Sequence, residues 1–160
     1  MKPLHKARAL ALIVPAALMA GALGSQYIGG LAPCEMCYWQ RWPHDAAIVL
    51  ALFAFAVKSP KAQQAFVLLA ALSILISGAI GGFHAGVEYG WWQGLTQCSQ
   101  PPGLTGGNFM DEIMKAPLIR CDQAQWTLFG ISLAGYNMIL SVAAFAAIVT
   151  LVQGKQHEGS

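Results

Sequence analysis

The segment AFVLLAALSILISGAIGGF, residues 65–83, decides the fold class of this chain because it contains no charged side chain. A helix of about 20 predominantly apolar residues crosses the hydrocarbon core of a bilayer. The segment therefore predicts a membrane-spanning helix. The composition agrees, since 56% of the 160 residues are hydrophobic and only 10% are charged, whereas an ordinary soluble domain is about 25% charged. We predict an integral membrane protein.

Three more apolar segments surround this one. Together they give four predicted spans, at about residues 9–30, 42–57, 64–84 and 126–152. The second is short in its purely apolar part and reaches membrane length only with the residues around Trp42. The first follows a basic N-terminus, so a cleaved signal peptide is an alternative interpretation. The predicted fold is an all-α membrane protein, a four-transmembrane-helix bundle that forms a single domain over residues 1–160.

The basic residues predict the orientation of this bundle. Cytoplasmic loops of membrane proteins carry an excess of Lys and Arg. With four spans, one side of the membrane receives Lys2, Lys6, Arg8, Lys58, Lys61 and Lys155. We therefore expect both termini in the cytoplasm and two periplasmic loops, at about residues 31–41 and 85–125. A net charge of +2, with no basic stripe, argues against nucleic-acid binding.

All four cysteines fall in the two outer loops. Cys34 and Cys37 lie in the first loop, and Cys98 and Cys121 lie in the second. The outer compartment of a bacterium is oxidising, so disulfides persist there. No cysteine falls in the cytoplasmic turn or in the middle of a predicted span. This shared location predicts redox chemistry or structural disulfides outside the cytoplasm.

The stretch APCEMCYWQRWPH, residues 32–44, contains the residues that most strongly indicate a chemical function. A Cys-x-x-Cys pair closes a small, reducible ring whose thiols often have a lowered pKa. Pro33 favours a helix start, which would put Cys34, Cys37 and Arg41 on one face. The helix N-terminus and the Arg41 cation would then favour a Cys37 thiolate. The alternative for Arg41 is an anchor at the membrane surface.

The other polar groups leave simpler interpretations open. A bond between Cys98 and Cys121 would close a loop that constrains the unfolded chain by roughly 3 kcal/mol, as a purely structural disulfide. Four cysteines also suit zinc, but zinc ribbons usually show two close pairs and this chain has one, so we predict no metal. His84 and Glu88 lie four residues apart, either as interfacial polar residues or as one helix face near a site.

Three motifs resemble the disulfide bond formation protein B (DsbB) family. PCEMCYWQRWP, residues 33–43, is similar to the family motif Cys-x-x-Cys-x-x-(Gln/Glu)-Arg. FHAGVEYGWW, residues 83–92, resembles the start of the family's second outer loop. CDQAQWTLFGISLAGYN, residues 121–137, resembles its entry into the fourth helix. The resemblance covers nearly the whole chain in order, and the first motif is the most specific of the three.

The resemblance implies a thiol:quinone oxidoreductase of the bacterial inner membrane. Such a protein reoxidises a periplasmic thioredoxin-like dithiol oxidase (DsbA-like) and passes the electrons to a membrane quinone, ubiquinone or menaquinone. By position, Cys98 would receive the partner's thiolate, with Cys121 as its loop partner. Cys34 and Cys37 would reoxidise the loop, with Cys37 next to the quinone. Arg41 would hold or polarise the quinone.

Two other functions remain open at this stage. One is a non-catalytic membrane scaffold or metal-binding protein whose cysteines only hold its loops. The other is a quinone-linked reductase of the vitamin K epoxide type, although that family is expected to carry its Cys-x-x-Cys late in the chain and here it comes early.

Overall fold

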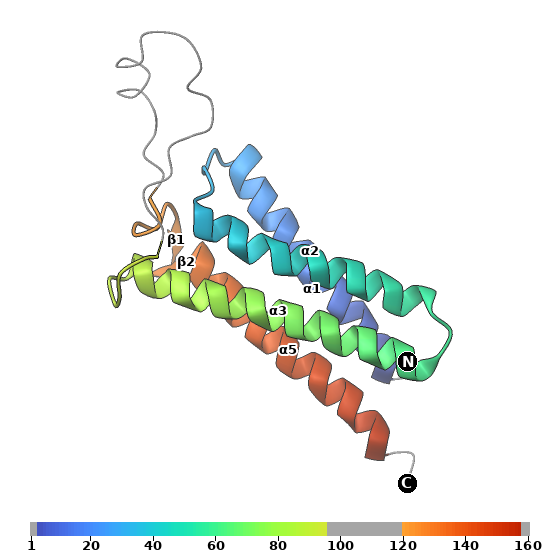
Figure 1. Cartoon of the computed structure of the whole chain (residues 1–160). Helices are drawn as coiled ribbons and strands as arrows, with labels where there is room; N and C mark the ends of the chain where they lie inside the picture. The colour runs from blue at the N-terminus through green and yellow to red at the C-terminus, as the bar shows by residue number, and fades with distance from the viewer. Residues whose placement is uncertain (1–2, 96–119, 158–160) are drawn as a thin grey trace, which may run out of the picture.

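The computed structural model describes residues 3–95 and 120–157 of the chain (Figure 1). Cys98 lies outside these residues. Within them the chain forms four helices and one two-stranded hairpin. These are α1 (Pro3–Tyr27), α2 (Glu35–Ala56), α3 (Pro60–Glu88), β1 (Thr127–Leu128), β2 (Ile131–Ser132) and α5 (Leu133–His157).

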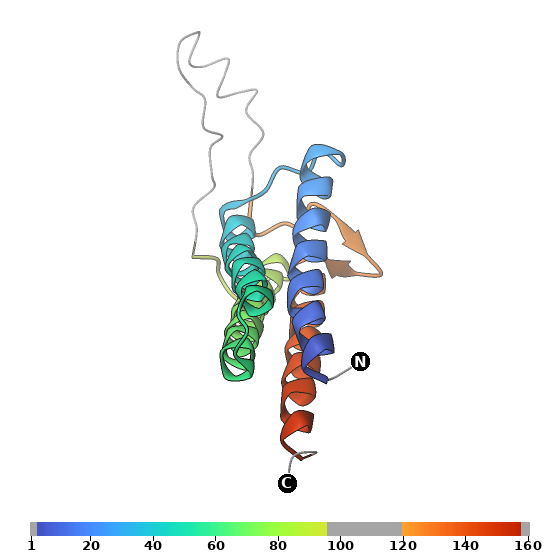
Figure 2. The ribbon, with the colours of Figure 1, turned by 90° about the vertical axis from the view of Figure 1, so that its right-hand side faces the viewer.

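The helices form an antiparallel bundle. Each helix runs in the opposite direction to the one before it, so both ends of the chain lie at the same end of the bundle (Figures 1 and 2). Helix α3 packs against both α2 and α5, while α1 contacts α2 and α5 from the other side. The α1–α2 connection and the hairpin lie at the end opposite the termini.

Three of the helices are long and apolar enough to cross a membrane. They are α1, α3 and the Leu133–Gly154 part of α5. Helix α2 has 22 residues, but its first half carries the charged side chains of Glu35, Arg41 and Asp45. The helical fold and three membrane-length helices are thus confirmed, whereas α2 as a fourth span and the periplasmic position of the loops stay predictions.

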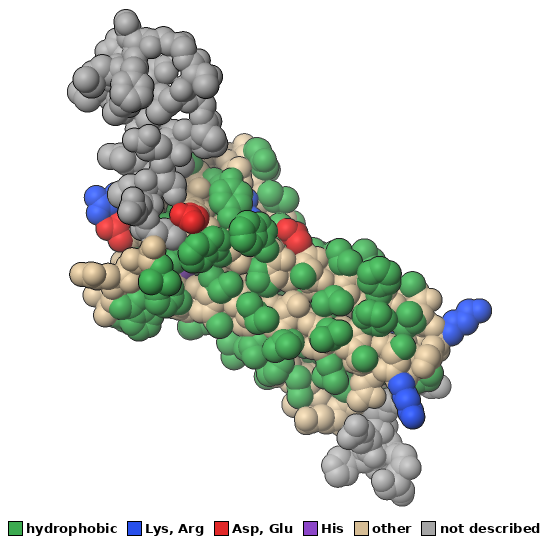
Figure 3. All heavy atoms as spheres, in the orientation of Figure 1, with side chains coloured by type: hydrophobic (Ala, Val, Ile, Leu, Met, Phe, Trp, Pro, Cys, Tyr) green, Lys and Arg blue, Asp and Glu red, His purple; other side chains and the backbone are tan. Residues whose placement is uncertain are grey.

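The distribution of side chains is the reverse of that in a soluble bundle. The buried core is rich in small residues, among them Ala7, Ala11, Ala47, Ala51, Ala54, Ala70, Ala71 and Ala144. Large apolar side chains such as Leu52, Phe53, Leu69, Leu72, Ile76 and Leu140 are exposed. Hydrophobic side chains cover most of the face drawn in Figure 3, with Lys and Arg toward its two ends. Such an exterior matches lipid, and the small residues inside allow close helix approach.

Glycines bring α3 and α5 closest together. A Cβ atom added to Gly78 would lie 2.8 Å from the Cβ of Ser141, and one added to Gly81 would lie 2.9 Å from the carbonyl oxygen of Ala134. Real Cβ atoms essentially never approach other heavy atoms this closely. The two helices can therefore meet at this distance only because α3 has no side chain at these positions.

The chain enters α5 differently from the sequence prediction, which began the fourth span at residue 126. Residues 127–132 form a hairpin instead, and the helix starts at Leu133. Phe129 and Gly130 both have positive φ, 50° and 77°, as a type I′ turn requires. The Tyr89 hydroxyl donates to the Gly130 carbonyl and accepts from the Ser132 amide. The end of α3 thus fixes the hairpin, and this tertiary contact outweighs the apolar character of the segment.

The close contact between α3 and α5 can be tested with one methyl group. We expect Gly81→Ala to destabilise the protein by about 1–3 kcal/mol, the usual cost of overpacking, because the Ala134 backbone cannot move without shifting α5. Thermal unfolding in mild detergent, followed by tryptophan fluorescence, measures the effect.

Gly24→Ala is the matched control, because nothing lies within 4 Å of a Cβ added to Gly24 in α1. Alanine also has a helix propensity up to about 1 kcal/mol better than glycine. The control should match or exceed the stability of the original protein, and equal behaviour of the two variants would show that α3 and α5 are not in close contact.

Candidate active site

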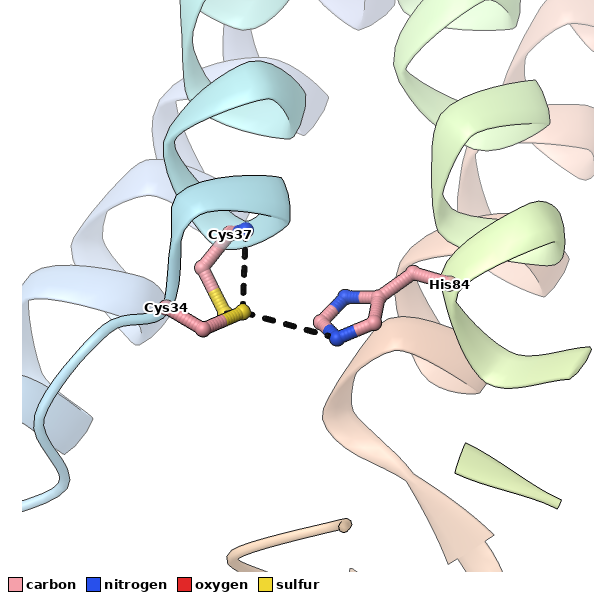
Figure 4. Close-up of side chains that lie close together, drawn as sticks. All are labelled: Cys34, Cys37 and His84. Carbon is pink, nitrogen blue, oxygen red and sulfur yellow. Dashed lines mark hydrogen bonds between the residues drawn. The ribbon is translucent and has the colours of Figure 1, made fainter. Parts of the chain in front are cut away.

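The start of α2 brings the first two cysteines together. Cys34 caps the helix in an extended conformation (φ −79°, ψ 174°), and its sulfur accepts a hydrogen bond from the Cys37 amide at 3.4 Å. Pro33 precedes the cap, and Glu35 places an acidic group in the first turn, where the helix dipole favours negative charge. The two sulfur atoms lie 3.1 Å apart as free thiols (Figure 4).

The second loop contributes Cys121 to the same place. Its side chain is 8% exposed and packs with Cys34, Met36 and Val87 in a small buried cluster. The thiols of Cys121 and Cys34 form a hydrogen bond. The structure therefore brings together three of the four predicted redox cysteines, while Cys98 lies outside the described residues. Sequence spacing alone contains no signal for the contact between the two loops.

These contacts give the thiols of Cys34 and Cys37 different acidities. Both residues precede the span predicted from residue 42. The neighbouring thiols of Cys121 and Cys37, which can each hydrogen-bond to Cys34, and burial raise the pKa of the Cys34 thiol far above its usual range. The hydrogen bond from Cys34 lowers the pKa of Cys37 against the opposing effect of burial. Cys37 is therefore the thiol of this pair that ionises first.

His84 of α3 points at the cysteine pair (Figure 4). Its Nε2 lies 3.5 Å from the Cys34 sulfur, and its Nδ1 lies 2.9 Å from Nε2 of Gln40. The same Gln40 nitrogen donates to the backbone carbonyl of Met36, an acceptor only, which identifies it as the amide nitrogen. His84 Nδ1 must therefore accept, and in the neutral ring the proton is on Nε2, facing the sulfur of Cys34.

Glu88 completes this buried end of α3. Its Oε1 lies 3.6 Å from His84 Nε2, and the two side chains are 7% and 3% exposed. Ser132 also interacts with the carboxyl group, but no group among the described residues has hydrogen-bonding geometry to Oε2. Of the two sequence interpretations, the structure favours a helix face at the site, since both side chains are buried beside the cysteines.

A polar network continues from Gln40 into the bundle. Asn137 of α5 donates from Nδ2 to the Gln40 Oε1 at 2.9 Å and to the Ser77 carbonyl at 3.2 Å. The Oδ1 atom of Asn137 lies 2.9 Å from Nε2 of His44. These residues were not among the predicted site residues, although Gln40 lies in the first quoted motif and Asn137 in the third. Their signal was available, because polar side chains are costly inside membrane helices and usually mark functional positions.

The geometry bears on metal binding as well. Ligand atoms of Cys34, Cys37 and His84 all lie within 4.8 Å of one another, a spacing that suits a metal ion. A metal on Nε2 would need this nitrogen unprotonated, with the proton on Nδ1 facing the amide nitrogen of Gln40. Two donors would then oppose each other in a buried position, which is unfavourable. The network thus fits a neutral histidine with its proton on Nε2 better than one that binds a metal through this nitrogen.

A cavity of 240 Å³ opens beside Cys37 and is lined by α1, the start of α2, the end of α3, residues 120–126 and the start of α5. Arg41 lies in its wall, with Nη1 donating to the Gln26 side chain of α1 at 2.7 Å and the guanidinium 5.1 Å from the centre of the Tyr38 ring. Most other lining groups are apolar. The cavity therefore suits an apolar molecule with a polar oxygen at the Arg41 end.

The unequal acidity of the cysteine pair predicts the order of alkylation. In the fully reduced protein we expect iodoacetamide to modify Cys37 at least about tenfold faster than Cys34 near neutral pH, because only the thiolate reacts and one pKa unit changes its population about tenfold. Raising the pH should reduce the difference between the alkylation rates of the two thiols. Tandem mass spectrometry locates the label. Faster labelling of Cys34 than of Cys37 would show that Cys34 is the thiol that ionises first.

Comparisons with known proteins give matches over most of the chain. The family model "Disulfide bond formation protein DsbB" matches residues 5–151. Disulfide bond formation protein B of Methylococcus capsulatus is 31% identical over 149 residues, covering 87% of this chain and 89% of the relative. The protein of the same name from Polaromonas sp. is 31% identical over 162 residues, covering 91% and 88%.

A further relative, the uncharacterized protein RP370 of Rickettsia prowazekii, is 26% identical over 122 residues, covering 74% of this chain and 70% of the relative. No solved structure matches the chain. The family match extends over all four described helices and includes the cysteine pair, His84 and Asn137. This chain belongs to the DsbB family of disulfide bond formation proteins.

Proposed function

We propose that this protein is a thiol:quinone oxidoreductase of the bacterial inner membrane, which reoxidises a periplasmic DsbA-like dithiol oxidase and passes the electrons to a membrane quinone. Family membership implies a role in disulfide bond formation. The observation that carries the finer proposal is the contact of Cys121 with Cys34, beside a cavity with Arg41 in its wall. Sulfur atoms from two loops thus meet next to a place for an apolar electron acceptor.

In the proposed topology all four helices span the membrane and the cysteine end faces the periplasm. Lys58 lies in the α2–α3 turn, at the same end of the bundle as both termini. Cys34 and Cys121 lie at the opposite end. The excess of basic residues in cytoplasmic segments favours this orientation.

The electrons move by four thiol–disulfide exchanges. The partner's first thiolate attacks Cys98 of a Cys98–Cys121 disulfide, and the partner's second thiol then releases Cys98, leaving an oxidised partner and a loop dithiol. Cys121 attacks Cys34 of a Cys34–Cys37 disulfide and frees Cys37 as a thiolate. Cys98 then attacks Cys121, restoring the loop disulfide and leaving Cys34 reduced. Each exchange forms one S–S bond and breaks one.

The acidities suit the third of these exchanges, the attack of Cys121 on Cys34. Cys121 contacts Cys34, so attack on Cys34 is a direct path. The leaving sulfur is then Cys37, the more acidic thiol of the pair, and a more acidic thiol leaves faster. When Cys34 leaves in turn, the Cys37 amide and His84 Nε2–H are placed to stabilise its charge.

The cavity residues fit a quinone. Arg41 offers guanidinium donors to a carbonyl oxygen, and Gln26 and Tyr38 hold its position. The apolar wall suits the ring, and Cys37 lines the same cavity. When bound, a quinone supplies a sink for two electrons and two protons. Arg41 would stabilise the negative charge that develops on the quinone oxygen.

A variant that turns over only once tests the relay, by which we mean the proposed electron path from the partner through the four cysteines to the quinone. We expect Cys37→Ser to oxidise one equivalent of a reduced dithiol partner, because the Cys98–Cys121 disulfide is still present, and then to stop. The unaltered protein should continue for many turnovers with loss of quinone absorbance. Continued quinone reduction by Cys37→Ser would exclude the proposed electron path, and bound zinc in stoichiometric amount would favour the metal-binding alternative.

The fourth span is tested by two cysteines placed in the connections before and after α2, in a cysteine-free background. Ile28→Cys and Lys58→Cys both replace exposed side chains. We expect an impermeant maleimide to label Ile28→Cys in cells with a permeabilised outer membrane, and Lys58→Cys only after the inner membrane is also opened. Labelling of both positions from the same side would show that α2 does not cross the membrane.

A further inference from the structure

His44 has no part in the thiol exchanges, yet it occupies a buried position in the cavity wall. It is 3% exposed and lines the same cavity as Arg41. A polar ring in the interior of a membrane bundle is costly unless its nitrogens have partners. One nitrogen, Nε2, has a partner in Asn137, but Nδ1 is buried and has no hydrogen-bond partner among the described residues.

The network determines which nitrogen of His44 carries the proton. The carbonyl oxygen of Ser77 can only accept, so the atom of Asn137 that faces it is the amide nitrogen. The other atom, Oδ1, therefore faces His44, at 2.9 Å from Nε2. The hydroxyl of Ser141 also donates to this oxygen. In the neutral ring the proton is on Nε2, and Nδ1 is an acceptor.

Among the polar side chains that line the cavity, Arg41 and His44 have opposite hydrogen-bonding character. Arg41 can only donate hydrogen bonds, whereas His44 Nδ1 can only accept one. The two residues lie three positions apart on α2, and side chains at this spacing are neighbours on one helix face, with Cβ atoms about 5–6 Å apart. A quinone carbonyl accepts but does not donate, so it satisfies Arg41 only. A hydroquinone hydroxyl does both, so the reduced ring can satisfy both residues.

We propose that His44 Nδ1 accepts a hydrogen bond from a hydroxyl group of a bound hydroquinone, so that the cavity binds the reduced form more tightly than the oxidised form. The inference rests on the proposed function, because it concerns the same cavity and the same electron acceptor. Preferential binding of the product makes the bound quinone a stronger oxidant, since a ligand shifts an equilibrium by its differential affinity for the two states. His44 would therefore be a binding residue that favours electron transfer out of the cysteine pair.

Two substitutions of His44 separate its nitrogens. In His44→Gln the side-chain amide reaches the position of Nε2 and keeps the bond to Asn137, but no atom replaces Nδ1. In His44→Asn the shorter amide places an acceptor near the position of Nδ1. Both variants are made in a Cys37→Ser background, so that a quinone is bound without being reduced. Their folding is checked by thermal unfolding.

Binding of a short-chain ubiquinone and of its hydroquinone is measured without oxygen by quenching of tryptophan fluorescence, since Trp126 lines the cavity. We expect His44→Gln to weaken hydroquinone binding about fivefold, the usual effect of losing one neutral hydrogen bond, and to change quinone binding less than twofold. His44→Asn should retain more of the hydroquinone affinity than His44→Gln.

The outcomes distinguish this inference from the proposed function. If His44→Gln keeps its hydroquinone affinity, or loses affinity for both forms equally, the role of Nδ1 is wrong and the relay is unaffected. If the parent protein binds neither form, the proposed function fails and this inference fails with it. Nitrogen NMR of the unaltered His44 gives a second test that needs no variant of that residue. The Nδ1 signal should shift on addition of hydroquinone and not of quinone, and an unchanged signal overturns the inference.

Discussion

The buried side chain of Gln40 is the constraint on which the rest of the site depends. Its amide nitrogen contacts the Met36 carbonyl and His84 Nδ1, and its oxygen accepts from Asn137. An amide left without partners in a low-dielectric interior costs several times more than a made hydrogen bond contributes. The registers of α2, α3 and α5 are therefore coupled, because sliding any one of them would break a bond that water cannot replace. The same bonds orient the histidine that faces the cysteines.

Small residues bring the helices close enough for this network to form. Side-chain amides reach across a helix interface only when the backbones approach closely, and Gly81 lies next to both Gln40 and Asn137. The alanine-rich core allows α2 and α3 to pack closely as well. Lipid provides no hydrophobic drive between apolar helices, so close packing and interhelical hydrogen bonds supply the stability. The position of the site thus follows from the close packing and interhelical hydrogen bonds that stabilise the bundle.

The parts predictable from sequence are those determined by short segments. Hydropathy identified residues 65–83 as helical because a single segment contains the whole signal, and the spacing of Cys34 and Cys37 predicted a pair at a helix start for the same reason. The Phe129–Gly130 turn escaped prediction because a positive φ at phenylalanine depends on its tertiary setting, here the Tyr89 hydroxyl. The contact of Cys34 with Cys121 escaped because it joins two loops that only the folded bundle brings together. Resemblance to a family, and not periodicity, identified Cys121 as part of the relay.

One chain of hydrogen bonds through the bundle has a single direction from donor to acceptor. His44 donates to Asn137, Asn137 donates to Gln40, Gln40 donates to His84, and His84 Nε2–H faces the sulfur of Cys34. Bonds in such a chain polarise one another. Negative charge on the sulfur draws each donor toward its acceptor, which leaves more electron density on the free nitrogen of His44 at the other end. The charge of the cysteine pair and the acceptor strength of His44 Nδ1 are therefore linked through Asn137, Gln40 and His84, which take no part in the thiol exchanges.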